Sequence, residues 1–356
     1  MNLIEFDIPK SIIEVLSVLS VNHVNYWLFG GSVREVFTEQ IPNDYDFVVT
    51  GIGREEFIEL LNQNHIENYL ISSRNQVQGV DIGGIYCEFA CCKGKGDLID
   101  YVKSLDFTCN SILLDLENGS VVDVFHGCED IEKKRIRTIL PPKLYYESNP
   151  TAMLRAAYVS MKTGFHIDKE SIAAMRNCKN SPFDKEHRII STRILNEILL
   201  NENAREGMKT LVDNGVLAKD FPKLNQRLVD GRVNFDELDY INKTVKPTNN
   251  DDKMDYKKIL LFMDIFECEE KNLGKLRFYD ERNSRTGKLL NQGVHYYNMI
   301  KNRTLEEIEN LIKSQNIGGK YQAEILNLIS ELSYIKDRYK TQERYFEESQ
   351  GERLEI

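Results

Sequence analysis

Two aspartates separated by one residue open an apolar run near the start of the chain. Asp44 and Asp46 begin the stretch DYDFVVT. In a β-strand, residues at i and i+2 project to the same face, so the two carboxylates would lie side by side. Like charges held together favour a bound cation, and oxygen ligands favour Mg²⁺, which completes its shell with water and substrate phosphates. The pair therefore predicts a catalytic Mg²⁺ site for phosphate chemistry, although such a pair also occurs often by chance.

A phosphate-binding turn precedes the aspartates. Gly30, Gly31 and Ser32 follow the apolar run WLF at a predicted strand-to-helix junction. Free backbone N–H groups and the positive end of a helix can face a phosphate there, since glycine has no Cβ in the way. Arg34 adds a fork of donors on the first helical turn. Together with the aspartates these residues predict a nucleoside triphosphate site, while the simpler alternative is an ordinary glycine turn.

Composition sets the broad class. The chain has 356 residues, which favours two or more domains, and its net charge of −10 argues against a generally basic nucleic-acid coat. Seven cysteines without a CxxC pair indicate buried thiols in a reducing compartment rather than a metal site. There is no basic stretch before an apolar one at the N-terminus, and no apolar run approaches the roughly 20 residues of a membrane span. A cytoplasmic protein without a membrane partner is expected.

The apolar spacing predicts an α/β unit up to about residue 140. A helix is expected over Ser11–Val21, with strands and a second helix after it. Asn118-Gly119 favours a tight hairpin turn, so at least part of the sheet should be antiparallel. The remaining predicted elements are strands over Tyr26–Phe29, Tyr45–Thr50, Ile85–Cys92, Phe107–Leu116 and Val121–Phe125, and a helix over Arg54–Asn62.

After Pro141-Pro142 the pattern becomes helical and strand signals nearly vanish. Helices are expected over Met153–Thr163, Ser191–Asn201 and Ala204–Asn214, and charged amphipathic helices over Thr304–Arg344. A polar linker is expected at 245–253 and a loosely held tail at 345–356. The predicted domains are a catalytic domain over 1–140, a helical nucleotide-binding neck over 141–225 and a helical acceptor-binding body and tail over 226–356.

The opening motif resembles a known signature. GGSVRE followed by DYD is similar to the GG-x-x-R-D and D-x-D pattern of the class II tRNA nucleotidyltransferases, which include CCA-adding enzymes and bacterial poly(A) polymerases. Glu35 stands where that family usually has aspartate. DFTCN at 106–110, the stretch 149–165 and STRILNEIL at 191–199 resemble further motifs of the family in the same order. The resemblance extends to about residue 225.

This resemblance implies a fold and a set of site residues. The fold is an α+β polymerase β-like nucleotidyltransferase domain with a mixed sheet, followed by all-α domains. Mg²⁺ would be held by Asp44 and Asp46, with Glu88 either supporting the metal or serving as a solvated or capping residue. The implied nucleotide-binding residues are Gly30, Gly31, Ser32, Arg34, Asp106, Asn110, Asn149, Arg155 and Arg193.

Departures from the family pattern fall at the positions that contact and read the nucleotide. Leu105 replaces an arginine, and Ser148, Asn149 and Ala152 stand where the family has Glu, Asp and Arg. Tyr158 replaces a second arginine. Asn149 can still donate and accept hydrogen bonds, but the charge-assisted partner is lost. An altered nucleotide selectivity is expected.

The expected function is metal-dependent transfer of a nucleoside monophosphate from an NTP, CTP or ATP by resemblance, to an RNA 3′ end, with tRNA the expected acceptor. A protein or small-molecule acceptor is the first alternative, and a silent RNA-binding module is the second. Intact Asp44 and Asp46 argue against the silent module, because paired carboxylates without a metal repel. The oligomeric state stays open.

A local basic stripe is predicted in the C-terminal region to grip the acceptor, with a solvated helix face as its alternative. Its members are Lys275, Arg277, Phe278, Tyr279, Arg282, Arg285 and Lys288.

Overall fold

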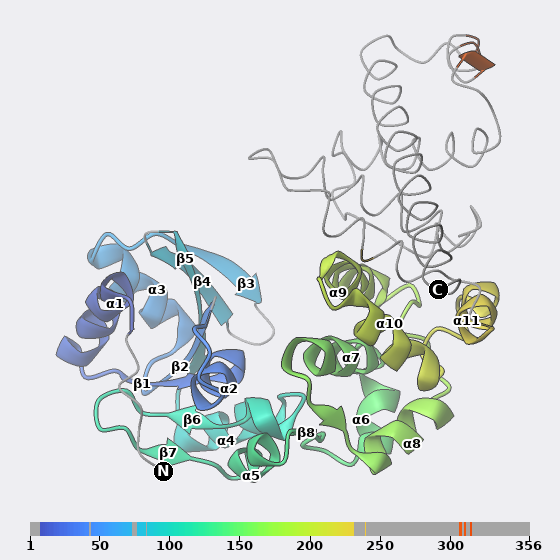
Figure 1. Cartoon of the computed structure of the whole chain (residues 1–356). Coiled ribbons are helices and arrows are strands. Elements are labelled where there is room, and N and C mark those ends of the chain that lie inside the picture. Colours follow the sequence, from blue (N-terminus) through green and yellow to red (C-terminus); the bar gives the residue numbers. More distant parts are fainter. Residues whose placement is uncertain are drawn as a thin grey trace, which may run out of the picture. The chain divides into compact units, whose positions relative to one another are not determined.

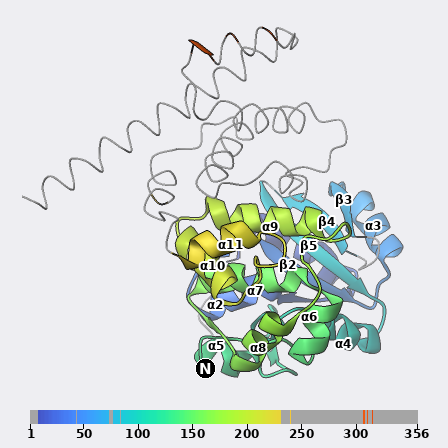
Figure 2. The same cartoon turned by 90° about the vertical axis from the view of Figure 1, so that its right-hand side faces the viewer.

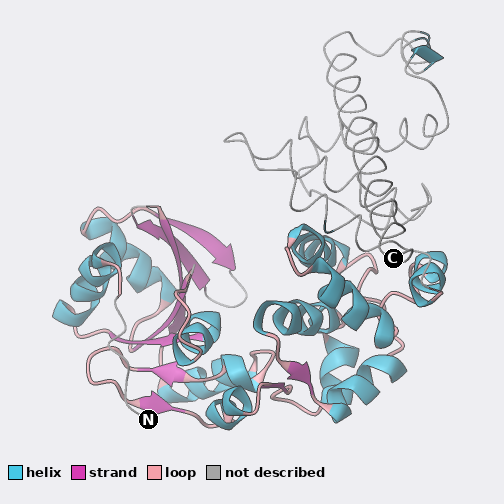
Figure 3. Ribbon diagram, viewed as in Figure 1, coloured by secondary structure: helices cyan, strands magenta, loops and turns pink. Residues whose placement is uncertain are grey.

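The computed structural model describes residues 8–42, 44–72, 77–82 and 84–230, and the single positions 239, 306, 307, 310 and 314. The chain divides into two units (Figure 1). The first comprises Met1–Tyr145 and Phe165–Ile172, and the second comprises Tyr146–Gly164 and Ala173–Ile356. In Figure 3 the strands of the larger sheet gather in the first unit, whereas the described part of the second is helical. The domain boundaries proposed from the sequence remain predictions.

The first unit is built around a mixed seven-stranded sheet in the order β3-β4-β5-β2-β1-β6-β7. Only β2 and β5 pair in parallel, and every other neighbouring pair is antiparallel. The mixed sheet expected from the sequence is therefore confirmed. Its strands are β1 (Asn25–Phe29), β2 (Tyr45–Thr50), β3 (Asn68–Ser72), β4 (Val77–Ile82), β5 (Ile85–Cys92), β6 (Leu113–Leu114) and β7 (Val121–Val122).

Helices and a second, two-stranded sheet complete the first unit. The short strands β8 (Arg135–Ile136) and β9 (His166–Ile167) pair in parallel. The helices are α1 (Lys10–Val21), α2 (Gly30–Phe37), α3 (Arg54–Gln63), α4 (Lys95–Lys103), the 3₁₀ turn η1 (Thr108–Asn110) and α5 (Gly127–Glu132). The chain passes between the units three times, within α6 (Pro142–Ser148), between Gly164 and Phe165, and within α8 (Lys169–Asn177).

Helices α3 and α4 cover opposite faces of the large sheet. Phe57 of α3 packs on Phe89, with ring centroids 5.3 Å apart. Successive side chains of a strand point to opposite faces, so Ala90 faces the other way. Ala90 belongs to an apolar cluster with Val102 of α4. Because both faces are buried, β2 and β5 read as almost continuous apolar runs, and the polar side chains of Asp46 and Glu88 stand out within them.

The second unit is a helical layer in which α7 (Thr151–Thr163), α9 (Arg188–Leu200) and α10 (Ala204–Asp213) pack against one another, followed by α11 (Pro222–Val229) (Figure 2). Gly207 permits the close approach, since a Cβ there would lie 2.6 Å from Cγ2 of Ile198 and 2.9 Å from Sδ of Met161. No helix within the described ranges is both long enough and apolar enough to span a bilayer.

The structure corrects two expectations from the sequence. The strand predicted over Phe107–Leu116 is wrong in its first half, where Phe107 makes only an isolated bridge to Thr138 and the 3₁₀ turn η1 follows. The side chains of Thr108 and Asn110 bond to Asp130 and Asp106 there. The hairpin at Asn118-Gly119 is confirmed, with Leu113 opposite Val122, but both strands are only two residues long. A short strand, β9, also interrupts the stretch expected to be purely helical.

The helices predicted over Ser11–Val21, Met153–Thr163, Ser191–Asn201 and Ala204–Asn214 are confirmed to within three residues at each end. The predicted linker and the basic stripe of residues 275–288 lie outside the described residues. Within the predicted helical segment 304–344, the described positions 306, 307, 310 and 314 are helical and exposed.

The cysteines behave as buried thiols. Cys87, Cys91, Cys92 and Cys109 are free and buried. Burial raises the pKa of Cys87, Cys91 and Cys109 to about 12 and that of Cys92 to about 11. These four thiols therefore stay protonated and unreactive at neutral pH. Cys128 and Cys178 are free and half-buried, and Cys268 lies outside the described residues.

Candidate active site

The site begins where β1 ends and α2 starts without an intervening loop. Gly30 has φ of +74°, a left-handed conformation that suits glycine. A Cβ on Gly30 would lie 2.8 Å from Oδ2 of Asp46, so the carboxylate occupies the space that any other residue would fill. The first glycine of the turn is thus required both for the backbone angle and for the close approach of Asp46.

Ser32 connects the helix start to the catalytic strand. Its buried hydroxyl donates to the carbonyl oxygen of Phe29 at 2.7 Å and accepts the backbone N–H of Asp46 at 3.3 Å. These contacts fix β2 against the first turn of α2. Ser32 therefore positions Asp46 in addition to the phosphate-binding role expected for its backbone.

The acidic residues lie close together but not in the arrangement drawn from the sequence. Asp46 is the second residue of β2, whereas Asp44 is exposed and precedes the strand. Asp46 pairs in register with Glu88 of β5, so the two side chains share a face. The charges of both Asp46 and Asp44 contribute to the raised pKa of Cys87, after burial as the main cause. Both aspartates therefore lie near the same point of the sheet.

Glu88 is engaged by a neighbour. Tyr86 donates its hydroxyl hydrogen to Oε1 of Glu88 at 2.7 Å. Within the described ranges, no group of three or more His, Cys, Asp or Glu side chains is arranged to hold a metal ion. The metal-binding roles of Asp44, Asp46 and Glu88 remain predictions.

Arg34 lies in a buried polar network rather than on the surface. Its guanidinium donates to Oδ1 of Asn110, and Nδ2 of Asn110 donates to Oδ1 of Asp106 at 3.0 Å. The same carboxylate oxygen accepts the backbone N–H of Phe107 at 2.8 Å. Arg34, Asn110 and Asp106 are all at most 7% exposed. The structure therefore links the first motif to the DFTCN motif through side chains.

We predict that Arg34→Ala lowers the free energy of unfolding of the first unit by about 1–3 kcal/mol, because it leaves the buried oxygen of Asn110 without its donor. A double-mutant cycle with Asn110→Ala, followed by urea unfolding, should give a coupling energy of about 0.5–3 kcal/mol. Additive losses would show that the two side chains act independently. NTP affinity measured on the same variants by calorimetry separates this positioning role from direct phosphate contact.

A second buried network, formed around Asp130, was not predicted from the sequence. Asp130 is fully buried, and its Oδ2 accepts from the hydroxyl of Thr108 at 2.5 Å and from Nε of Arg137 at 2.9 Å. Arg135 pairs with the other carboxylate oxygen. The signal lies in the spacing, since Asp130 and the two arginines flank a short turn. This network holds η1, and with it Asn110, in place.

The predicted base-reading residues lie in the second unit, which is described by itself. Oδ1 of Asn149 accepts from the hydroxyl of Thr151 at 2.5 Å. Ala152 is completely buried within α7 and presents no surface. Arg155 is exposed on α7, and Arg193 of α9 is exposed and pairs with Glu197 at 3.5 Å. Within the described residues, the polar side chains of this group that reach the surface are those of Ser148, Asn149, Arg155 and Arg193.

Two replaced positions have taken structural roles. Leu105 packs against the apolar cluster under α4. Tyr158 is half-buried, and the ammonium of Lys162 lies 5.6 Å from the centre of its ring. Neither side chain can supply the guanidinium that the resemblance expects there.

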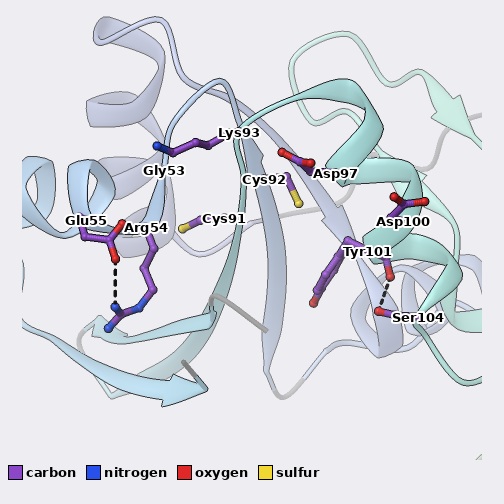
Figure 4. A pocket seen from close by; sticks show the side chains of 10 residues that line it. All are labelled: Gly53, Arg54, Glu55, Cys91, Cys92, Lys93, Asp97, Asp100, Tyr101 and Ser104. Atoms are coloured by element: carbon purple, nitrogen blue, oxygen red, sulfur yellow. Dashed lines mark hydrogen bonds and ion pairs between the residues drawn. The ribbon is translucent and has the colours of Figure 1, made fainter. Parts of the chain in front are cut away.

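A cavity of about 470 Å³ lies where α3 and α4 begin, beside the end of β5 (Figure 4). None of the predicted site residues lines it. The backbone N–H groups at the two helix starts are already bonded, that of Gly53 to Glu56 at 2.8 Å and that of Gly94 to Asp97 at 3.0 Å. The cavity adjoins the aspartate site through Tyr101, which lines it and lies within range of the charge of Asp46.

The mixed sheet with Asp46 against the Gly30 turn defines a polymerase β-like nucleotidyltransferase fold. Solved structures share it: the CCA-adding enzyme of Bacillus stearothermophilus in complex with CTP matches with a TM-score of 0.62 at 16% identity, over 91% of this chain and 83% of that one. The Thermotoga maritima CCA-adding enzyme complexed with tRNA matches with a TM-score of 0.60 at 15% identity, over 94% and 83%.

Residues 26–137 match the poly A polymerase head domain family. The Multifunctional CCA protein of Nitrosospira multiformis is 26% identical over 216 residues, covering 56% of this chain and 50% of the relative. The CC-adding tRNA nucleotidyltransferase of Halalkalibacterium halodurans is 28% identical over 170 residues, covering 48% and 43%. The chain spans about half the length of the curated relatives it matches. The expected resemblance is confirmed: the chain is similar to class II tRNA nucleotidyltransferases, and its residues 26–137 match the poly A polymerase head domain.

Proposed function

We propose that this chain transfers nucleoside monophosphates from an NTP to the 3′-hydroxyl of a tRNA, with Mg²⁺ as the metal and with nucleotide selectivity altered from that of CCA addition. The observation that carries the proposal is the carboxylate of Asp46 held against Gly30 at the start of α2. This arrangement puts a candidate metal ligand beside the N-terminus of a helix, whose first N–H groups have no partner within the helix, as phosphoryl transfer requires.

The residues present fit a magnesium ion. Asp44 and Asp46 provide only oxygen ligands, and two carboxylates are the usual protein share of such a site. Asp46 is fixed through Ser32, whereas Asp44 is exposed and open to water and substrate. When bound, Mg²⁺ supplies charge that polarises the α-phosphate and lowers the pKa of the attacking hydroxyl.

The remaining roles belong to the chain itself. Backbone N–H groups at Gly31 and Ser32 bind the triphosphate at the positive end of α2. Asp106 and Asn110 orient the nucleotide, and Arg34 holds both in position from behind through its bond to Asn110. Arg155 and Arg193 supply positive charge from the helical unit.

The acceptor is inferred from relatives. Both curated relatives named above are, by their names, enzymes of CCA or CC addition, and one matched structure contains tRNA. The CC-adding relative is an example of an enzyme of this kind that adds only part of the sequence. Such partial addition agrees with a rebuilt base-reading region in this chain.

Nucleotide choice is the decisive test of the altered selectivity. We predict that the purified protein, given a tRNA lacking its 3′ CCA and all four NTPs at equal concentration, incorporates one nucleotide type or several without the ordered C, C, A series. The reason is that Asn149 lacks a guanidinium partner, and loss of one bidentate contact removes about 1–3 kcal/mol of discrimination, a scale taken from DNA base readout. Sequencing of the extended 3′ ends gives the readout.

Three results of this experiment distinguish the proposed function from its alternatives. Ordered C, C, A addition would refute the altered selectivity and keep tRNA extension. Transfer of labelled nucleotide to a protein or small molecule, without RNA extension, would favour the alternative acceptor. Tight RNA binding without transfer to any acceptor would identify a silent binding module.

A further inference from the structure

One row of side chains crosses five strands on the face that carries the catalytic carboxylate. The strand registers place Tyr69 opposite Gly79, Gly79 opposite Glu88, Glu88 opposite Asp46 and Asp46 opposite Phe29. Residues paired across neighbouring strands point to the same face. The row therefore runs without a break from the candidate catalytic site to the edge strand β3.

At the edge of the sheet the row ends in an exposed aromatic ring. A Cβ on Gly79 would lie 2.7 Å from Cε2 and 2.9 Å from Cζ of Tyr69, so the ring lies across the sheet directly above the glycine. Cδ1 of Ile71 lies at 2.8 Å from the same point. Tyr69 nevertheless stays 45% exposed and Ile71 39% exposed. One face of the ring is thus supported by the sheet, while much of the side chain remains open to solvent.

Tyr86 connects this ring to the acidic residues. The ring centroids of Tyr69 and Tyr86 are 6.3 Å apart with an interplanar angle of 36°. Tyr86 in turn donates to Glu88, the register partner of Asp46. We name the surface formed by Tyr69, Ile71 and Tyr86 around Gly79 the tyrosine platform.

We propose that the tyrosine platform stacks the base at the 3′ end of the acceptor strand and so places its hydroxyl beside Asp46; this rests on the proposed function. A flat, supported and half-exposed ring suits any nucleobase, because stacking needs only a π face. Gly79 lies two strands from Asp46, or roughly 10 Å at the usual strand spacing. One nucleoside and a metal ion bridge that distance.

The chemistry favours a single-stranded nucleic acid as the occupant. The platform adjoins the carboxylates proposed to act on a 3′-hydroxyl, and the half-exposed ring of Tyr69 offers its open face to a base. The simpler explanation is that Tyr69 only shields the bare backbone at Gly79, as aromatic side chains do for glycine in sheets. That explanation predicts a loss of stability upon substitution and no effect on the acceptor.

The test compares Tyr69→Leu, which fills the space over Gly79 without a flat ring, with Tyr69→Phe, which keeps the ring. Leu70→Ala is the matched control, because Leu70 is 53% exposed on the opposite face of the same strand. Binding of the full chain to a short single-stranded RNA is measured by fluorescence anisotropy, and KM values for tRNA and NTP by extension. Tyr69→Leu should weaken RNA binding and raise the KM for tRNA about tenfold, within the range of one base–aromatic stack. In Tyr69→Phe and Leu70→Ala, RNA binding and the KM for tRNA should change less than about twofold. The KM for NTP should change less than about twofold in all three variants.

Equal behaviour of the Leu and Phe variants, unchanged RNA binding in Tyr69→Leu, or absence of RNA binding by the wild-type chain would each overturn the platform. Ring-dependent RNA binding by a wild-type chain that extends no tRNA would keep the platform and refute the proposed function. Melting of each variant, followed by circular dichroism, shows whether loss of fold accounts for any change.

Discussion

Replacing Asp46 with asparagine will abolish nucleotidyl transfer while leaving the first unit folded. The carboxylate is the proposed metal ligand, and it lies against Gly30 on a strand that Ser32 bonds through the backbone of residue 46. Loss of its charge removes several kcal/mol of transition-state stabilisation, or about a thousandfold in rate. The fold should persist, because the bond from Ser32 is made to the backbone of residue 46 and not to its side chain. Single-turnover extension of labelled tRNA measures the rate, and Asp44→Asn should share the loss.

Asp81→Asn is the matched control for this prediction. Asp81 is a third carboxylate that acts on Cys87, so its substitution makes the same change of charge in the same neighbourhood. It accepts the backbone N–H of Gly84 at 2.9 Å, a bond that asparagine can keep. Asp81→Asn should retain a near-normal rate. A near-normal rate in Asp46→Asn would remove Asp46 from the metal site.

Replacing Asp130 with alanine will strongly destabilise the first unit. The carboxylate has no exposed surface and binds Thr108, Arg135 and Arg137. Removing one partner of a buried charge network typically costs about 3–5 kcal/mol, because the remaining charges are left uncompensated. The partial exposure of the two arginines places the expected loss near the lower end of that range, about 3 kcal/mol.

The chain offers a selective probe for this measurement. Trp27 is its only tryptophan and lies in β1, packed on the apolar cluster of the first unit. Its fluorescence during urea unfolding therefore reports the first unit without interference from the second. Glu129→Gln is the control, since Glu129 is exposed and its lowered pKa comes from the neighbouring Lys133. An unchanged midpoint in Asp130→Ala would mean that η1 is held by other contacts.

The sequence predicted correctly those elements whose burial can be read from the apolar spacing of a single segment. The helix at Lys10–Val21 buries Ile12, Val15, Leu16 and Leu19, the spacing visible in the sequence. Strand β4 was not predicted, because Gly79 and Asp81 weaken its strand signal. Its strand conformation is stabilised by pairing with β3 and β5, which the local sequence does not reveal. Helix α4 begins between two glycines and was missed for a similar reason.

In the candidate site, too, contacts between residues close in sequence could be predicted, whereas contacts between distant residues could not. Gly30 directly follows β1, whose antiparallel neighbour β2 carries Asp46, and the types and spacing of these two residues already indicated a joint role. The partner of Arg34 could not be predicted, because Asn110 lies 76 residues further along the chain. The sequence assigned Arg34 to the phosphates, whereas in the structure its guanidinium donates to the side-chain oxygen of Asn110. The direct phosphate contact stays a prediction.

Because Arg34 and Asn110 are far apart along the chain, the parts of the candidate site are made at different times during translation. The segment β1-α2-β2 ends at Thr50 and can assemble through contacts between neighbouring segments as soon as it emerges from a ribosome. Asp46 pairs with Glu88 only after α3, β3 and β4 have been made, and Arg34 meets Asn110 later still. A nascent chain stopped before Asn110 would already carry the glycine turn and both aspartates, yet its buried guanidinium would lack the amide that receives it. Nucleotide affinity is therefore expected to arise late in translation, after the catalytic aspartates are in place.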